Sequence, residues 1–116
     1  MEEESDIINK SEVLVSLIYK ICRGLPRGDD FMFKSHLSRT AIFISSNLAE
    51  GQKKGKEEFR EYINTSIESL KELKAQLNMV KEKNYVQISA FDINKALDLC
   101  GELDKMIHEL LLKLNA

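Results

Sequence analysis

Apolar residues recur along this chain at the spacing of α-helices. Steps of three and four residues return a side chain to the same helix face at each turn. The first such stripe consists of Leu14, Ile18, Ile21 and Leu25. Ser5 or Asp6 is expected to cap its helix, because a short side-chain oxygen accepts a free backbone N–H. Gly24 and Pro26 are expected to end it, since glycine tolerates a left-handed cap and proline cannot continue a helix. The pattern predicts a helix over residues 6–23.

Two further stripes follow. The second consists of Phe33, Leu37, Ala41, Ile44 and Leu48. It predicts a helix over 30–50 that is capped by Asp29 or Asp30 and stops at Gly51. The third consists of Phe59, Ile63, Ser66, Leu70, Leu73, Leu77 and Val80. This is an unbroken heptad seam, the spacing with which helices pack knobs into holes, and it predicts a helix over 56–83.

The last stripe completes a bundle. It consists of Ala96, Cys100, Leu103, Ile107, Leu110 and Leu114. Ser89 is expected to cap a helix over 90–114, with Asp92 in its first turn. Four amphipathic helices with short connections predict an all-α fold, a single antiparallel up-down-up-down four-helix bundle over residues 1–116. Three further apolar residues widen the last stripe, as at an oligomer interface; they are Leu99, Met106 and Leu111.

Composition limits the function classes. The chain has 116 residues, of which 43% are hydrophobic and 31% charged, as in one globular domain. The net charge of −2 argues against nonspecific attraction of the whole molecule to nucleic acid. The acidic start is unlike a signal peptide and no apolar run approaches ~18 residues, so we expect a cytoplasmic protein without a membrane partner. Cys22 and Cys100 lie in the stripes and are expected to be buried free thiols.

No catalytic constellation is found in the sequence. A phosphate-binding P-loop needs four residues between its glycines and a Ser or Thr after the lysine, but Gly51 and Gly55 enclose three residues and Glu57 follows Lys56. A di-metal bundle needs Glu-x-x-His pairs, which neither histidine forms. His108 follows Asp104 by four residues, which favours a surface ion pair. We expect no enzyme activity, no metal, no cofactor and no small-molecule substrate.

A basic segment surrounds the predicted joint between the second and third helices. Residues 34–60 carry six Lys or Arg against three Glu, so the segment is net +3. Such a patch can hold phosphates. The alternative is a solvated turn whose lysines only keep it soluble. The candidate residues for binding nucleic acid or a partner are Arg39, Lys53, Lys54, Lys56 and Arg60.

Five polar residues are expected to face inward. They are Arg39, Asn47 and Glu50 on the second helix and Glu72 and Gln76 on the third. In an antiparallel pair of these helices, Arg39 passes near residues 67–72. This position allows an ion pair of Arg39 with Glu68 or Glu72. A partly buried pair fixes the register of two helices more than it adds stability, so the expected role is structural.

The stretch HLSRTAIFISSNLAEG resembles the signature of the four-helix-bundle proteins encoded in intervening sequences of bacterial 23S rRNA genes. The matching positions are Leu37, Arg39, Ala41, Ile44, Asn47, Leu48, Ala49, Glu50 and Gly51. A second group of matches is Glu58, Phe59, Ser69, Leu70, Glu72, Leu73, Gln76 and Leu77. Ser38 replaces one of two paired arginines, Ser45 a proline and Gly55 a common serine. The lost arginine weakens a nucleic-acid role for the second helix.

The resemblance implies a left-handed antiparallel bundle that forms ring-like homo-oligomers, with pentamers as the expected form. Related bundles accompany the reverse transcriptases of diversity-generating retroelements, where a pentameric barrel is thought to bind RNA and the polymerase. Our leading hypothesis is therefore a noncatalytic homo-oligomer that binds structured, for example ribosomal, RNA or a nucleoprotein partner. The alternative is a protein–protein adaptor without a nucleic-acid role, which the pI of about 5.7 favours.

Overall fold

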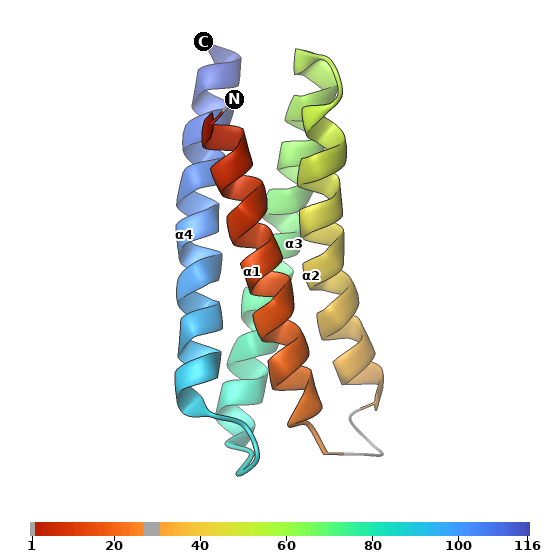
Figure 1. Cartoon of the computed structure of the whole chain (residues 1–116), viewed down its shortest axis with the longest axis vertical. Coiled ribbons are helices and arrows are strands. Elements are labelled where there is room, and N and C mark those ends of the chain that lie inside the picture. The colour runs from red at the N-terminus through yellow and green to blue at the C-terminus, as the bar shows by residue number, and fades with distance from the viewer. Residues whose placement is uncertain (1, 27–30) are drawn as a thin grey trace.

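The structure is a computed structural model, which describes residues 2–26 and 31–116. This part of the chain contains four helices (Figure 1). Their bounds are α1 Glu2–Arg23, α2 Phe31–Gln52, α3 Lys56–Lys83 and α4 Ala90–Asn115. Successive helices run in opposite directions, and each helix contacts its two neighbours in a ring, α1 with α2 and α4, and α3 with α2 and α4. The predicted all-α, antiparallel four-helix bundle is confirmed.

The predicted stripes form the core. Their members are buried, except that Phe33 and Leu114 near the stripe ends are partly buried. Each fully buried Leu or Ile contributes about 1.5–3 kcal/mol relative to exposure. The core therefore extends along the bundle. Ser66, on the α3 stripe, is fully buried, and a larger side chain at this position would hold the helices apart. None of the helices in the described part of the chain is long and apolar enough to cross a membrane.

The helix starts differ from expectation in one case. α1 already begins at Glu2, so Ser5 and Asp6 lie inside the helix and the cap predicted there was wrong. The three acidic residues of the first turn are the physical reason, because negative charge stabilises the positive end of the helix dipole. The cap predicted at Asp29 or Asp30 lies outside the described residues. The cap at Ser89 is confirmed, since its side chain accepts a hydrogen bond from the Asp92 backbone N–H at 3.3 Å.

A close contact, not a left-handed cap, explains Gly24 after α1. Its backbone is not left-handed, and a Cβ there would lie 2.9 Å from both the Gln87 carbonyl oxygen and Ile88 Cγ1. The glycine thus lets the α3–α4 connection pass against the end of α1. Among the described residues at this end of the bundle, Asn84 is left-handed, with φ of 52°. Its backbone N–H donates a hydrogen bond to the Lys81 carbonyl, and α3 ends there.

Gly51 does not stop α2, which continues to Gln52, so the predicted stop was wrong. A Cβ on Gly51 would lie 2.7 Å from Tyr62 Cβ and 3.0 Å from Phe59 Cδ1 of α3. The glycine is required for the close approach of two helices just before the turn that joins them. Its small size, rather than its backbone freedom, explains its place in the sequence.

We predict that Gly51→Ala lowers the free energy of unfolding by about 1–3 kcal/mol, because the added methyl group overpacks the α2–α3 contact. Gly101→Ala is the matched control, since Gly101 lies inside α4 with no atom within 4 Å of its added Cβ. There alanine is expected to raise stability by up to about 1 kcal/mol through its better helix propensity. Urea unfolding followed by circular dichroism measures the free energy of unfolding of both variants. Equal stabilisation by the two substitutions would contradict a close contact at Gly51.

Candidate functional site

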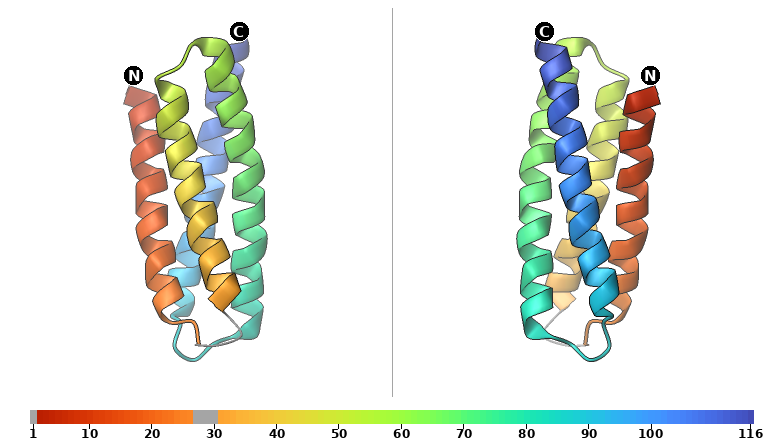
Figure 2. Two further views of the ribbon diagram at one scale, coloured as in Figure 1. Left: turned by 90° about the vertical axis from the view of Figure 1, so that its right-hand side faces the viewer. Right: turned by 90° about the vertical axis from the view of Figure 1, so that its left-hand side faces the viewer.

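The turn between α2 and α3 presents three exposed lysines at the end of the bundle that also holds both termini (Figure 2). Lys53 lies 3.8 Å from Glu50, and both side chains are more than half exposed, so this ion pair contributes little. Lys54 and Lys56 form no ion pair with any described residue. The turn therefore offers cations that are free to meet an anionic partner.

Arg60 differs from these lysines because it is engaged within the bundle. It is partly buried, and its Nη2 donates a 3.1 Å hydrogen bond to the carbonyl of Leu114. Carbonyls in the last turn of a helix lack intrahelical partners and carry the negative end of the dipole. Its Nε is buried without a partner in the described structure. Arg60 thus ties the start of α3 to the end of α4.

The surroundings of the turn are acidic. Glu57 and Glu58 stand exposed in the first turn of α3, and α1 begins with three glutamates. The Lys113 ammonium donates a hydrogen bond to the Glu3 carboxylate, and this hydrogen bond raises the pKa of the lysine. The positive charge of the lysine turn is consequently local, on an end of the bundle whose other charges are mostly negative.

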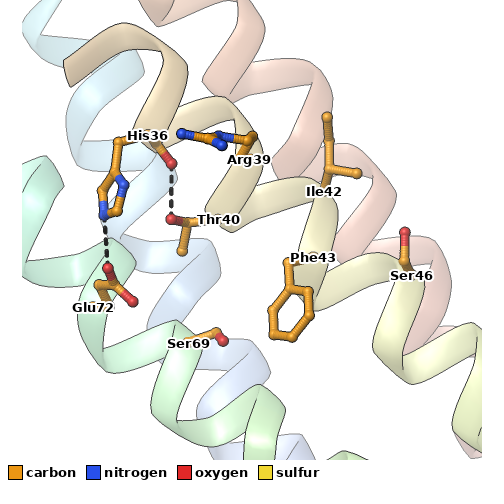
Figure 3. A pocket seen from close by; sticks show the side chains of 8 residues that line it. All are labelled: His36, Arg39, Thr40, Ile42, Phe43, Ser46, Ser69 and Glu72. Carbon is orange, nitrogen blue, oxygen red and sulfur yellow. Dashed lines mark hydrogen bonds and ion pairs between the residues drawn. The ribbon is translucent and has the colours of Figure 1, made fainter. Parts of the chain in front are cut away.

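A groove of about 590 Å³ runs between α2 and α3 (Figure 3). Its lining residues are His36, Arg39, Thr40, Ile42, Phe43, Ser46, Ser69 and Glu72. Phe43 is 48% exposed and Ile42 39%, so two adjacent large apolar side chains of α2 are open to solvent here. Arg39 is exposed beside them and forms no ion pair with a described residue.

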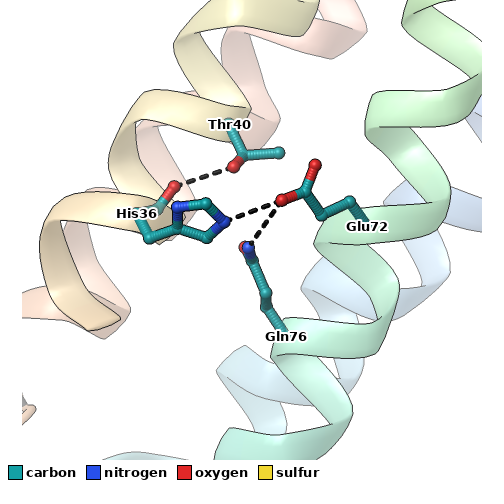
Figure 4. Close-up of polar contacts among 4 residues, drawn as sticks. All are labelled: His36, Thr40, Glu72 and Gln76. Atoms are coloured by element: carbon teal, nitrogen blue, oxygen red, sulfur yellow. Dashed lines mark hydrogen bonds and ion pairs between the residues drawn. The ribbon is translucent and has the colours of Figure 1, made fainter. Parts of the chain in front are cut away.

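Glu72 is bound by His36 instead of Arg39 (Figure 4). His36 Nε2 lies 2.7 Å from Glu72 Oε1, and Gln76 Nε2 donates to the same oxygen at 3.5 Å. Neither pair that the sequence allowed for Arg39 is present, because His36 reaches Glu72 while Arg39 is exposed and pairs with no described residue. Glu68 is 3.4 Å from Lys71 on its own helix.

The expectation that five polar residues face inward holds for Gln76 alone, which is buried. Arg39, Glu50 and Glu72 are exposed, so it was wrong for these three. Asn47 is half-buried, and its Nδ2 is enclosed without a hydrogen-bond partner in the described structure. Apart from Gln76, these polar residues flank the α2–α3 contact rather than entering the core.

The two cysteines are buried free thiols, as predicted. Burial raises the pKa of Cys100 to about 12 and also raises the pKa of Cys22, so both stay protonated near neutral pH. The predicted pairing of His108 is present, with Nδ1 3.6 Å from Asp104 Oδ1. No group of three or more potential metal-ligating side chains occurs among residues 2–26 and 31–116.

The model of the 23S rRNA-intervening sequence protein family matches residues 3–109. This chain belongs to that family. A crystal structure of a protein of unknown function, from the S23 ribosomal protein family of Bacteroides thetaiotaomicron VPI-5482, has the same fold with a TM-score of 0.81. The two chains are 16% identical over 94% of this chain and 97% of the other, so the likeness shows the fold alone. No curated protein matches this chain.

Sequence reasoning missed the apolar outer side of α2. The signal was present, because Ile42 and Phe43 stand between the stripe residues Ala41 and Ile44. Such a run makes a helix apolar around more of its circumference than one buried face requires. It also missed the partner of Arg60, which is 54 residues away in the sequence.

We predict that Arg60→Ala lowers the free energy of unfolding by about 1–3 kcal/mol, because it removes a hydrogen bond from a charged group to the end of α4. Lys56→Ala, at an exposed site without a described partner, is the matched control and should change stability by less than about 0.5 kcal/mol. Urea unfolding of the two variants measures the difference. If both substitutions change the free energy of unfolding by the same small amount, Arg60 does not stabilise the bundle and is a free surface cation like the lysines.

Proposed function

We propose that this chain is a noncatalytic, self-associating helical bundle that binds structured RNA through the lysines of the α2–α3 turn. The proposal rests on the three exposed lysines there, two of them without an ion pair among the described residues. Lysine is a flexible point charge, suited to phosphates whose positions vary with sequence. The family description refers to a 23S rRNA sequence, which makes ribosomal RNA the first RNA to test.

The outer side of α2 supports self-association. We define the α2 face as Ile42, Phe43, Ser46 and the half-buried Ala49. Its two large side chains are exposed apolar surface, and its two small residues allow another helix to approach. Arg39 lies beside this face without a described ion partner, so a carboxylate of a neighbouring copy can meet it there.

A second, different surface suits the other side of such a contact. Val13, Leu99 and Met106 line a hollow between α1 and α4, across the bundle from the α2–α3 groove. Packing of the α2 face on this hollow of the next copy is a heterologous contact, which generates a ring when the rotation closes. The proposed assembly is a ring of five copies, the number implied by the family resemblance.

The alternative function is a protein–protein adaptor that does not bind nucleic acid. The exposed Ile42 and Phe43 favour it, because they can anchor a different protein as well as a second copy. The acidic residues around the lysine turn also favour it. The adaptor requires that the purified chain leave the α2 face uncovered, whereas self-association covers it.

We predict that Ile42→Glu dissociates the assembly, since a charge in an apolar contact loses its hydration. Analytical ultracentrifugation should give several times 13.3 kDa for the wild type and 13.3 kDa for the variant. Met79→Glu places the same charge at an exposed site on α3 and should leave the mass unchanged. A wild-type chain that sediments as a monomer would contradict self-association and favour the adaptor.

We predict that Lys54→Glu with Lys56→Glu weakens binding to a 23S rRNA hairpin for all hairpin sequences and reduces the log–log salt slope by about two. Lys71→Glu with Lys105→Glu is the control, because it changes the net charge equally at exposed sites on α3 and α4 away from the turn. Fluorescence anisotropy measures both affinities. Equal losses in the two variants would show a general charge effect and remove the turn from the proposal.

A further inference from the structure

The end of the bundle opposite the lysine turn also carries an unusual surface. We define the α3–α4 tip as residues 81–95, at the lower end of Figure 1. A turn closed by the hydrogen bond from the Ile88 N–H to the Tyr85 carbonyl exposes 97% of Val86. Phe91, in the first turn of α4, is 73% exposed. These are the two most exposed large apolar side chains among the described residues.

The tip is held in place although its apolar side chains are exposed. Ile88 and Ile93 are buried in the core on either side of Phe91. Ser89 caps α4, and Gly24 packs directly against Gln87 and Ile88. The exposed Phe91 ring is therefore presented by a rigid element and has no packing role of its own.

The charges of the α3–α4 tip are mainly positive and free. Lys81, Lys83 and Lys95 are exposed and form no ion pair with a described residue. Lys95 follows Phe91 by four residues, so the two share one face of α4. Of the two acids within the tip, Asp92 is mostly covered and lies 3.3 Å from Lys20. Glu82 is the remaining one.

An aromatic ring among free lysines suits a single-stranded nucleic acid. Bases stack on such rings whatever their sequence, and the cations hold the phosphates on either side. A stable protein–protein interface generally buries about 800 Å² of surface on each partner, more than two exposed side chains provide. A single exposed ring, that of Phe91, is a sufficient platform for an unstacked base.

We propose that the α3–α4 tip binds unpaired nucleotides of RNA, with a base stacked on Phe91 and phosphates held by Lys81, Lys83 and Lys95. This inference rests on the proposed RNA-binding function and deepens it. It places single-stranded RNA at the end of the bundle opposite the lysine turn, on a molecule whose long axis extends 46 Å.

A single tryptophan tests the stacking directly, because the chain contains none. We expect the fluorescence of Phe91→Trp to be quenched when a 12-nucleotide oligoadenylate is added, and not by inorganic polyphosphate. Leu112→Trp is the matched control, since Leu112 is 71% exposed near the other end of the same helix, and it should stay unquenched. Equal quenching of the two tryptophans, or equal quenching by polyphosphate, would overturn the proposal.

Affinities give an independent readout. Phe91→Ala is expected to weaken binding of the oligoadenylate about 5- to 150-fold, the usual loss when one stacking ring is removed. Leu112→Ala should leave it unchanged, and circular dichroism should show both variants equally folded. Unchanged binding by Phe91→Ala would overturn the proposal. A second result would also overturn it. If the fluorescence of Phe91→Trp responds to vesicles of phosphatidylglycerol but not to the oligoadenylate, the tip binds a membrane surface instead.

The hairpin and the oligoadenylate separate this inference from the proposed function. If Lys54→Glu with Lys56→Glu abolishes binding of the hairpin while Phe91→Ala still binds the oligoadenylate, the proposed role of the lysine turn is supported and that of the tip is refuted. If Phe91→Ala abolishes binding of the oligoadenylate while the double lysine variant still binds the hairpin, the role of the tip is supported and that of the lysine turn is refuted. Loss in both experiments supports both surfaces.

Discussion

The burial of one apolar stripe on each helix is the constraint on which the rest of this bundle depends. Isolated helices of this length gain little stability in water from propensity alone, so packing of the stripes must hold them. The steps of three and four residues leave most of the positions between them outside the core. The lysine turn, the α2 face and the exposed residues of the α3–α4 tip lie outside the core, on the helices or on the short turns that join them.

Small residues then set how closely the stripes meet. Ser66 lies within the α3 seam, and Gly51 and Gly24 stand where a backbone passes a neighbouring segment at contact distance. The polar residues near α2 and α3 have a lesser part. His36, Glu72 and Gln76 bridge the two helices at the surface, and Arg60 joins α3 to the end of α4. Packing determines the fold, while these bonds adjust the placement of its surfaces.

The helices and their pairing were predictable because helical periodicity is visible in a single sequence. What could not be predicted depends on rotation and distance. Gly51 has the same sequence appearance as a helix stop and as a close-packing residue, and only the proximity of Tyr62 distinguishes the two. His36 and Arg39 are three residues apart, and a small rotation of α2 decides which of them reaches Glu72. Of the candidate site, the position of the lysines on a turn was predictable, whereas the partner of Arg60 and the exposure of Phe91 were not.

The proposed RNA binding rests on the two ends of the bundle, on free lysines at one end and on an exposed aromatic ring with lysines at the other. The most direct test is a titration of the wild-type protein with a 23S rRNA hairpin that has a single-stranded extension, at several salt concentrations. Several phosphate contacts predict that the logarithm of the affinity falls linearly with the logarithm of salt, at nearly one unit of slope per contact. No binding even at low salt would contradict the account.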